Sequence, residues 1–110
     1  MSHYLLNTFN LQMLVEFPAS VQIEEIPENE GWAMLADVQQ FSSIPERIFS
    51  AIDNADMAAV LGVPMNRIKV TLRKGDIALV AQLQGGQLPE GSVVLPDGFY
   101  FKFLLVAVKL

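Results

Sequence analysis

The stretch from residue 99 to residue 108 constrains the fold most, because it is apolar on both faces of the strand that it would form. Its large apolar side chains alternate between the two sides, with Phe99, Phe101, Phe103 and Leu105 on one and Tyr100, Leu104 and Val106 on the other. A strand that reads as a nearly continuous apolar run is covered on both faces. We therefore expect a central or interfacial strand. An aromatic stripe of this kind could also stack on the bases of a ligand, but we expect these phenylalanines to belong to the core.

Four other segments have the two-residue period of strands. Residues 4–6 form a short apolar run, and residues 21–26 alternate between Pro18 and Pro27. In residues 67–73 the apolar side chains alternate with polar and basic ones, and the turn-forming Lys74-Gly75-Asp76 leads into a further apolar run over 77–84. Alternation on both sides of a short glycine-containing turn predicts a β-hairpin there.

The segment between these two groups of strands has helical spacing. Met34, Val38 and Phe41 recur at that spacing and predict a helix over 30–41. Ser43-Ile44-Pro45-Glu46 has the form of a capping box and predicts a second short helix. Asn54 is expected to cap a further turn or two that Gly62 ends. We therefore expect residues 43–62 to be broken helix.

The order of these elements predicts an α/β fold in one domain over residues 1–110. Two strands, then helices, then three strands make a mixed β-sheet of about five strands with helices packed on it. A chain of 110 residues, 52% of them hydrophobic, can build one core. Some of this apolar excess is expected in a subunit interface, and the simplest closed arrangement is a homodimer.

Composition excludes several classes of function. No apolar run reaches the roughly 20 residues of a membrane span, and residues 1–4 lack the features of a signal peptide, so we expect a soluble, unexported, cytoplasmic protein without membrane partners. With no cysteine and one histidine there is no ligand set for zinc, and no cofactor is expected. A net charge of −5 argues against general DNA or RNA binding. An anionic ligand must then be small and meet a local basic cluster.

One candidate for such a cluster is formed by Arg67, Lys69 and Arg73. These three side chains alternate with apolar positions, so they share one face of the predicted strand. They could hold phosphates, and Arg67 in particular carries the planar guanidinium that pairs well with a phosphate. A solvated sheet face is the other interpretation of the same pattern.

Four ordered blocks of the sequence resemble a known family. They are Tyr4-Leu5-Leu6-Asn7-Thr8-Phe9-Asn10-Leu11-Gln12-Met13-Leu14, Leu61-Gly62-Val63-Pro64-Met65-Asn66-Arg67-Ile68, Gly75-Asp76 before an apolar strand, and Leu88-Pro89-Glu90-Gly91. Together they are similar to the ring nucleases of viruses and mobile elements, which remove cyclic tetra-adenylate, the second messenger of type III CRISPR defence. The resemblance implies a dimeric α/β protein that holds the ring across its two-fold axis and needs no metal.

The resemblance also implies site residues. Asn7 matches the family's ligand-contacting asparagine, Arg67 its Asn-Arg-Ile arginine and Glu90 its acidic loop residue, while Gln87 replaces the loop arginine. The implied ligand-binding set is Asn7, Thr8, Asn66, Arg67, Gln87 and Glu90. The family's Ser-x-x-Gly-His, with its main catalytic histidine, has only Ser42-Ser43-Ile44-Pro45-Glu46 or Ser50-Ala51-Ile52-Asp53-Asn54 as counterparts, and neither contains a histidine.

Loss of that histidine matters because the leaving 5′-oxygen needs a proton, and a positioned acid typically contributes about a hundred- to ten-thousand-fold. We therefore expect binding and sequestration of a cyclic oligonucleotide, most simply cyclic tetra-adenylate, which would antagonise nucleotide-activated antiviral defence in the host cytoplasm if the source is a virus. A slow metal-independent ring nuclease using Glu90 or Glu46, with Asp53 and His3 as other candidate acids, is the first alternative. A structural or protein-interaction viral protein with this fold is the second.

Overall fold

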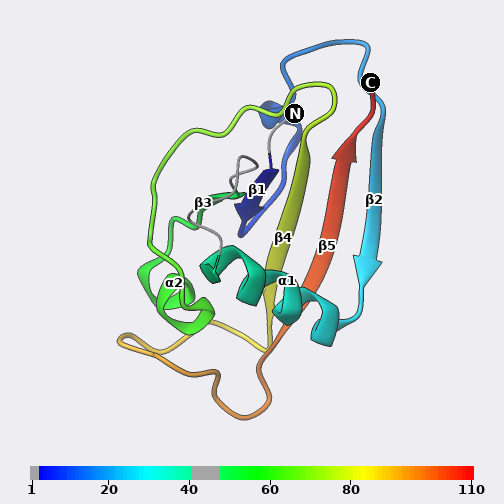
Figure 1. The fold of residues 1–110 in the computed structure, drawn as a ribbon. Helices are drawn as coiled ribbons and strands as arrows, with labels where there is room; N and C mark the ends of the chain where they lie inside the picture. The colour runs from blue at the N-terminus through cyan, green and yellow to red at the C-terminus, as the bar shows by residue number, and fades with distance from the viewer. Residues whose placement is uncertain (1–2, 41–47) are drawn as a thin grey trace.

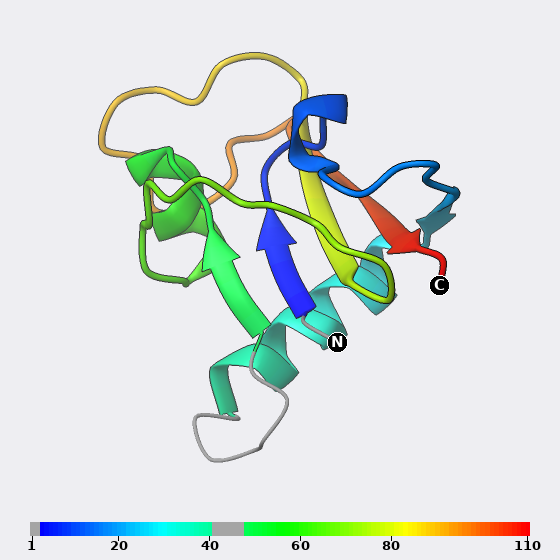
Figure 2. The ribbon, with the colours of Figure 1, turned by 90° about the horizontal axis from the view of Figure 1, so that it is seen from above.

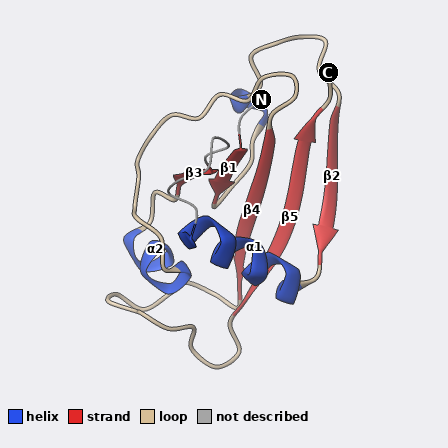
Figure 3. Ribbon diagram, in the orientation of Figure 1, coloured by secondary structure: helices blue, strands red, loops and turns tan. Residues whose placement is uncertain are grey.

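The computed structural model describes residues 3–40 and 48–110, and it contains one five-stranded sheet with helices on it (Figures 1 and 3). The main elements in chain order are β1 (His3–Leu6), β2 (Val21–Ile26), α1 (Glu28–Gln40), β3 (Ile48–Ala51), α2 (Ala55–Leu61), β4 (Ile77–Gln84) and β5 (Tyr100–Val108). The strands lie in the order β2-β5-β4-β1-β3. The α/β class and the mixed sheet of about five strands are confirmed.

β5 is an interior strand, as its sequence predicts. It pairs antiparallel with β2 on one side and with β4 on the other. Phe101 and Phe103 are buried on one face of the sheet, and Val106 and Val108 on the other. The phenylalanine pair is therefore core, as expected.

β3 corrects the prediction that residues 43–62 are broken helix. Residues 48–51 pair in parallel with β1, with His3 opposite Ile48 and Leu6 opposite Ala51. Isoleucine and phenylalanine favour strands, and pairing with β1 decides the conformation of a run this short. The proposed capping box at 43–46 lies outside the described residues. The later part of the prediction is confirmed, because Asn54 caps α2 and Gly62 ends it in the left-handed region at φ 72°.

The predicted hairpin between residues 67–73 and β4 is wrong. β4 already has β5 on one side and β1, in parallel, on the other, so neither of its edges is free for another strand. Residues 67–73 instead make only an isolated parallel bridge, in which the Leu72 amide donates to the Met13 carbonyl at 2.7 Å. The alternating apolar side chains Val70 and Leu72 are buried, but the segment does not form a ladder of strand hydrogen bonds.

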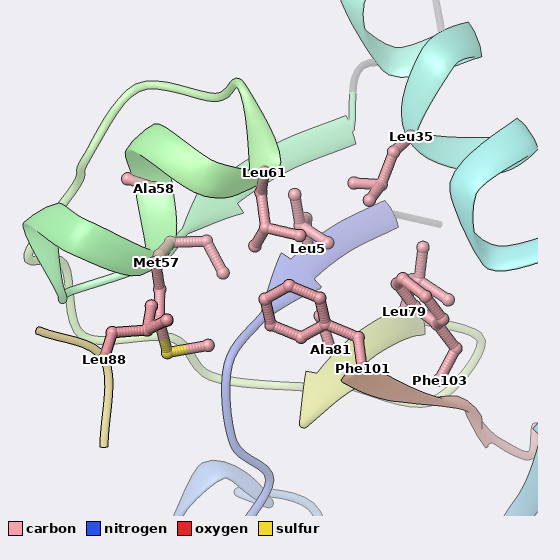
Figure 4. Packing of buried hydrophobic residues seen from close by; sticks show 11 residues of the cluster. Leu5, Leu35, Met57, Ala58, Leu61, Leu79, Ala81, Leu88, Phe101 and Phe103 are labelled. Atoms are coloured by element: carbon pink, nitrogen blue, oxygen red, sulfur yellow. The ribbon is translucent and has the colours of Figure 1, made fainter. Parts of the chain in front are cut away.

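The sheet has a hydrophobic cluster on each face. On one face, residues of α1 and α2 pack on the strands, and Figure 4 shows Leu35 and Leu61 directed toward Leu5, with Met57 beside Leu88. On the other face, Leu6, Val80 and Val106 are covered by irregular segments that contribute Leu14 and Leu72. Seen from above, α1 crosses one side of the strands and these irregular segments cross the other (Figure 2).

The helix predicted over 30–41 is observed as α1, and it approaches β5 very closely at Gly31. A Cβ atom built on Gly31 would overlap the ring of Phe103. Trp32 meets Phe101 and Phe103 edge-on, with ring centroids 5.8 and 5.9 Å apart. A glycine at this position therefore lets an aromatic ring pack directly against the helix backbone.

Candidate functional site

The site is built around the carboxyl ends of the parallel strands β1 and β3. Asn7 follows β1 and Asp53 follows β3 after Ile52. Parallel neighbours place their carboxyl ends at the same edge of the sheet. The two side chains accordingly meet, and Asn7 Nδ2 donates to Asp53 Oδ1 at 2.7 Å.

A second segment, around Asn66, lies along β3 and brings Arg67 to the same end of the sheet. The backbone N–H of Asn66 donates to the carbonyl of Ile52 at 2.9 Å, and its side-chain Nδ2 donates to the carbonyl of Ser50 at 3.0 Å. Asn66 thus satisfies backbone acceptors on the outer edge of β3. Arg67, the next residue, is exposed beside the carboxyl end of that strand.

The loop between β4 and β5 supplies the third segment. Leu88 is buried in the same cluster as Met57 of α2, and Figure 4 shows the two side chains together. The Gly91 amide donates to Asp56 Oδ1 at 3.0 Å. These two anchors hold the part of the loop that contains Gln87 and Glu90, both exposed, beside α2.

The structure thus brings the six residues of the implied ligand-binding set to one end of the sheet. Asn7, Asn66 and Arg67 come from the β1 and β3 ends, Thr8 is exposed directly after Asn7, and Gln87 and Glu90 come from the loop. This end carries a guanidinium, amide groups and carboxylates. It can therefore both donate hydrogen bonds to a small ligand and accept them from it. Arg67 can add one charge-assisted contact to a phosphate.

Other candidate residues lie elsewhere. His3 begins β1, so it lies at the opposite end of that strand from Asn7, and this placement argues against its role as a replacement acid. The basic residues at 67, 69 and 73 do not share a strand face, because the segment is not a strand. Arg73 belongs to the turn before β4, where its amide donates to Asp76 Oδ2 at 2.8 Å. Glu46 lies outside the described residues.

Sequence reasoning missed the structural roles of Asp53 and Asp56. Asp53 was a candidate acid only, and its contact with Asn7 follows from a strand that was expected to be helix. A usable signal is nevertheless present, since Asp53 directly follows the segment 48–52, in which Ser50 is the one polar residue. Asp56 looks like an ordinary acidic residue of a first helical turn, and nothing local indicates its bond to Gly91.

Within residues 3–40 and 48–110, no three His, Cys, Asp or Glu side chains are grouped so as to hold a metal ion. Over the same ranges, no helix has the length and apolar character needed to cross a membrane.

Comparisons with known proteins agree with this architecture. The structure is similar to B116 of Sulfolobus turreted icosahedral virus (STIV), with a TM-score of 0.78 and 23% sequence identity over 97% of this chain and 99% of that one. At this identity the likeness shows the fold. A search of curated proteins gives no match. The model of the STIV B116-like family matches residues 3–98, which contain β1 to β4 and both α-helices, and the chain therefore belongs to the STIV B116-like family.

Proposed function

We propose that the protein binds a cyclic oligonucleotide, most simply cyclic tetra-adenylate, and sequesters it. The observation that carries this proposal is the meeting of three ring-nuclease-like sequence blocks at one end of the sheet. Three hydrogen bonds hold them there, from Asn7 to Asp53, from Asn66 to Ser50 and from Gly91 to Asp56. Segments that are far apart in sequence, and that were singled out by resemblance alone, thus all attach to residues 50–56 at this end of the sheet.

Each side chain has a distinct part in this proposal. Arg67 is exposed and pairs with a phosphate of the ring, since a guanidinium forms strong charge-assisted bonds to phosphate oxygens. Asn66 has its own amide engaged by Ser50 and acts by holding Arg67 at the β3 edge. Gln87, Glu90 and Thr8 are exposed around the site and contribute hydrogen bonds to ribose or base.

A homodimer completes the proposed site. A two-fold axis would present Arg67 twice, to phosphates that are related by the symmetry of a tetra-adenylate ring. Large exposed apolar side chains, among them Leu11 and Phe17, are available for such an interface. A dimeric mass by light scattering at micromolar protein supports this part of the proposal, and a monomeric mass contradicts it.

Sequestration is preferred to rapid cleavage because the chain's only histidine begins β1, at the end of that strand away from Asn7. If Glu90 or Glu46 acts as the acid, we expect cleavage at least about a hundred times slower than with a positioned histidine. A protein of viral origin would in this way antagonise a nucleotide-activated defence in the host cytoplasm.

The test is a thermal-shift and calorimetric titration with cyclic di-, tri-, tetra- and hexa-adenylates. A ligand present at 100 times its dissociation constant adds about 2.7 kcal/mol of stability. Stabilisation by one ring size supports the proposal, and an unchanged melting temperature across the panel contradicts it. Labelled ligand recovered intact after a single-turnover incubation supports sequestration, whereas linear product shows a nuclease.

A protein-interaction function is the second candidate, and one surface favours it. Val93 and Val94, in the loop between β4 and β5, are 69% and 72% exposed. Exposed apolar side chains that lie next to each other can form part of a contact surface. Replacing both valines by serine should leave nucleotide binding unchanged and abolish binding of the partner protein.

A further inference from the structure

We infer that Asp53 is a positioning residue that fixes the side-chain amide of Asn7, so that Asn7 presents its Oδ1 to the ligand. This inference rests on the proposed function and names the kind of ligand group that contacts Asn7. The matching ligand group is a hydrogen-bond donor, either a ribose hydroxyl or an adenine amino group, and not a phosphate.

The orientation of the Asn7 amide follows from the chemistry of its partner. An asparagine amide can be turned so that either its oxygen or its nitrogen faces a neighbour. A carboxylate accepts hydrogen bonds and does not donate them. Because Asp53 Oδ1 lies 2.7 Å from the Asn7 amide, Nδ2 must face Asp53, and Oδ1 of Asn7 must point away from it.

Asp53 is free for this role because a neighbouring residue caps the helix. The side chain of Asn54 accepts hydrogen bonds from the amides of Asp56 and Met57, at 3.0 and 3.1 Å. Asp53 itself is exposed, as is its bond to Asn7, so burial does not account for the pair. The contact therefore joins two strand ends through polar groups at the surface where the ligand is proposed to lie.

The same pair selects against a phosphate at this position. The carboxylate of Asp53 repels an anion, and the negative end of the Asn7 amide dipole faces outward. Among the residues that the structure describes, none donates to Asn7 Oδ1. A ligand donor can fill that acceptor, while the phosphates of the ring go to Arg67 on the other side of β3.

The first experiment separates the hydrogen bond from the charge. Asp53→Asn retains an acceptor for Asn7 and removes the negative charge, whereas Asp53→Ala removes both. We expect calorimetry with cyclic tetra-adenylate to give near wild-type affinity for Asp53→Asn and about tenfold weaker binding for Asp53→Ala, with matching melting temperatures. Equal affinity in the two variants and wild type overturns the inference, and so does equal loss in both variants.

The control is Glu16→Ala, which removes one charge and one exposed hydrogen bond elsewhere. Glu16 Oε1 accepts from the Lys74 amide at 2.9 Å, at the amino end of β4 and thus at the far end of the sheet. This variant should bind the ring as wild type does. A loss equal to that of Asp53→Ala would overturn the inference, because it would make the effect one of net charge or of general stability.

The second experiment identifies the donor. Wild type and Asn7→Ala are titrated with cyclic tetra-adenylate, with its 2′-deoxy analogue and with cyclic tetra-inosinate, which lacks the amino group. We expect Asn7→Ala to weaken binding of the parent ring but not of the one analogue that lacks the donor. Equal weakening of all three rings overturns the donor assignment. Failure of wild type to bind the parent ring instead refutes the proposed function itself.

Discussion

Replacing Gly31 with alanine tests how tightly α1 packs on β5. In an exposed helix, glycine to alanine stabilises by about 1 kcal/mol. Here the added methyl would overlap the Phe103 ring. That ring is fully buried and flanked by Trp32 and Phe101, with centroids 5.9 and 6.1 Å away, so turning the ring would disturb both neighbours.

Overpacking of a filled core typically costs about 1–3 kcal/mol. Because the overlap involves the ring carbons rather than the end of a flexible chain, we place the cost at the upper end of this range. Subtracting the gain in helix propensity leaves a net destabilisation of about 2 kcal/mol. For a domain of this size, that change lowers the melting temperature by about 8–15 °C.

The assay is urea unfolding together with a thermal melt, with Asn29→Ala as the matched control. Asn29 lies two residues earlier in α1 and is exposed, so its replacement should leave stability unchanged or raise it slightly. A double variant with Phe103→Leu should recover part of the loss caused by Gly31→Ala, because the two positions are in contact. A Gly31→Ala protein as stable as wild type would refute the packing argument.

Other variants test the site and its supports. Arg67→Ala should weaken cyclic tetra-adenylate binding by roughly two to four orders of magnitude, because a dimer would lose two charge-assisted bonds. The melting temperature should be nearly unchanged, and calorimetry together with a thermal melt checks both expectations. Asn54→Ala should destabilise by about 1 kcal/mol in urea unfolding, because the amides of Asp56 and Met57 lose their acceptor. Asp56→Ala removes the acceptor of the Gly91 amide and should speed limited proteolysis between residues 85 and 99. An unchanged cleavage rate would show that Leu88 alone holds that loop.

The elements that were predictable from the sequence are those with local signals. β5 is apolar on both faces, and such a strand has to be covered from both sides. α2 begins at an asparagine cap and ends at a glycine with positive φ, and both features are specified within a few residues. The chemistry of its own residues defines each of these elements.

The elements that were missed depend on neighbours in space. β3 is four residues long and becomes a strand by pairing with β1, so nothing within it could decide the matter. Residues 67–73 alternate as a strand would, but β4 already has two partners. The same limit applies to the site, since Asn7 and Asp53 were each candidates from the resemblance but the contact between them was not expected.

The strand order also determines when during synthesis the sheet can form. β1 is made first, yet its partners are residues 48–51 and 77–80. β2 waits longer, because among the described strands it pairs with β5 alone. During folding, β1, β3 and β4 can therefore pair while β2 still lacks a neighbour, and the five-stranded sheet is complete only when β5 pairs between β4 and β2. Folding dominated by such distant pairings is slow, and β2 would be open to wrong partners until then.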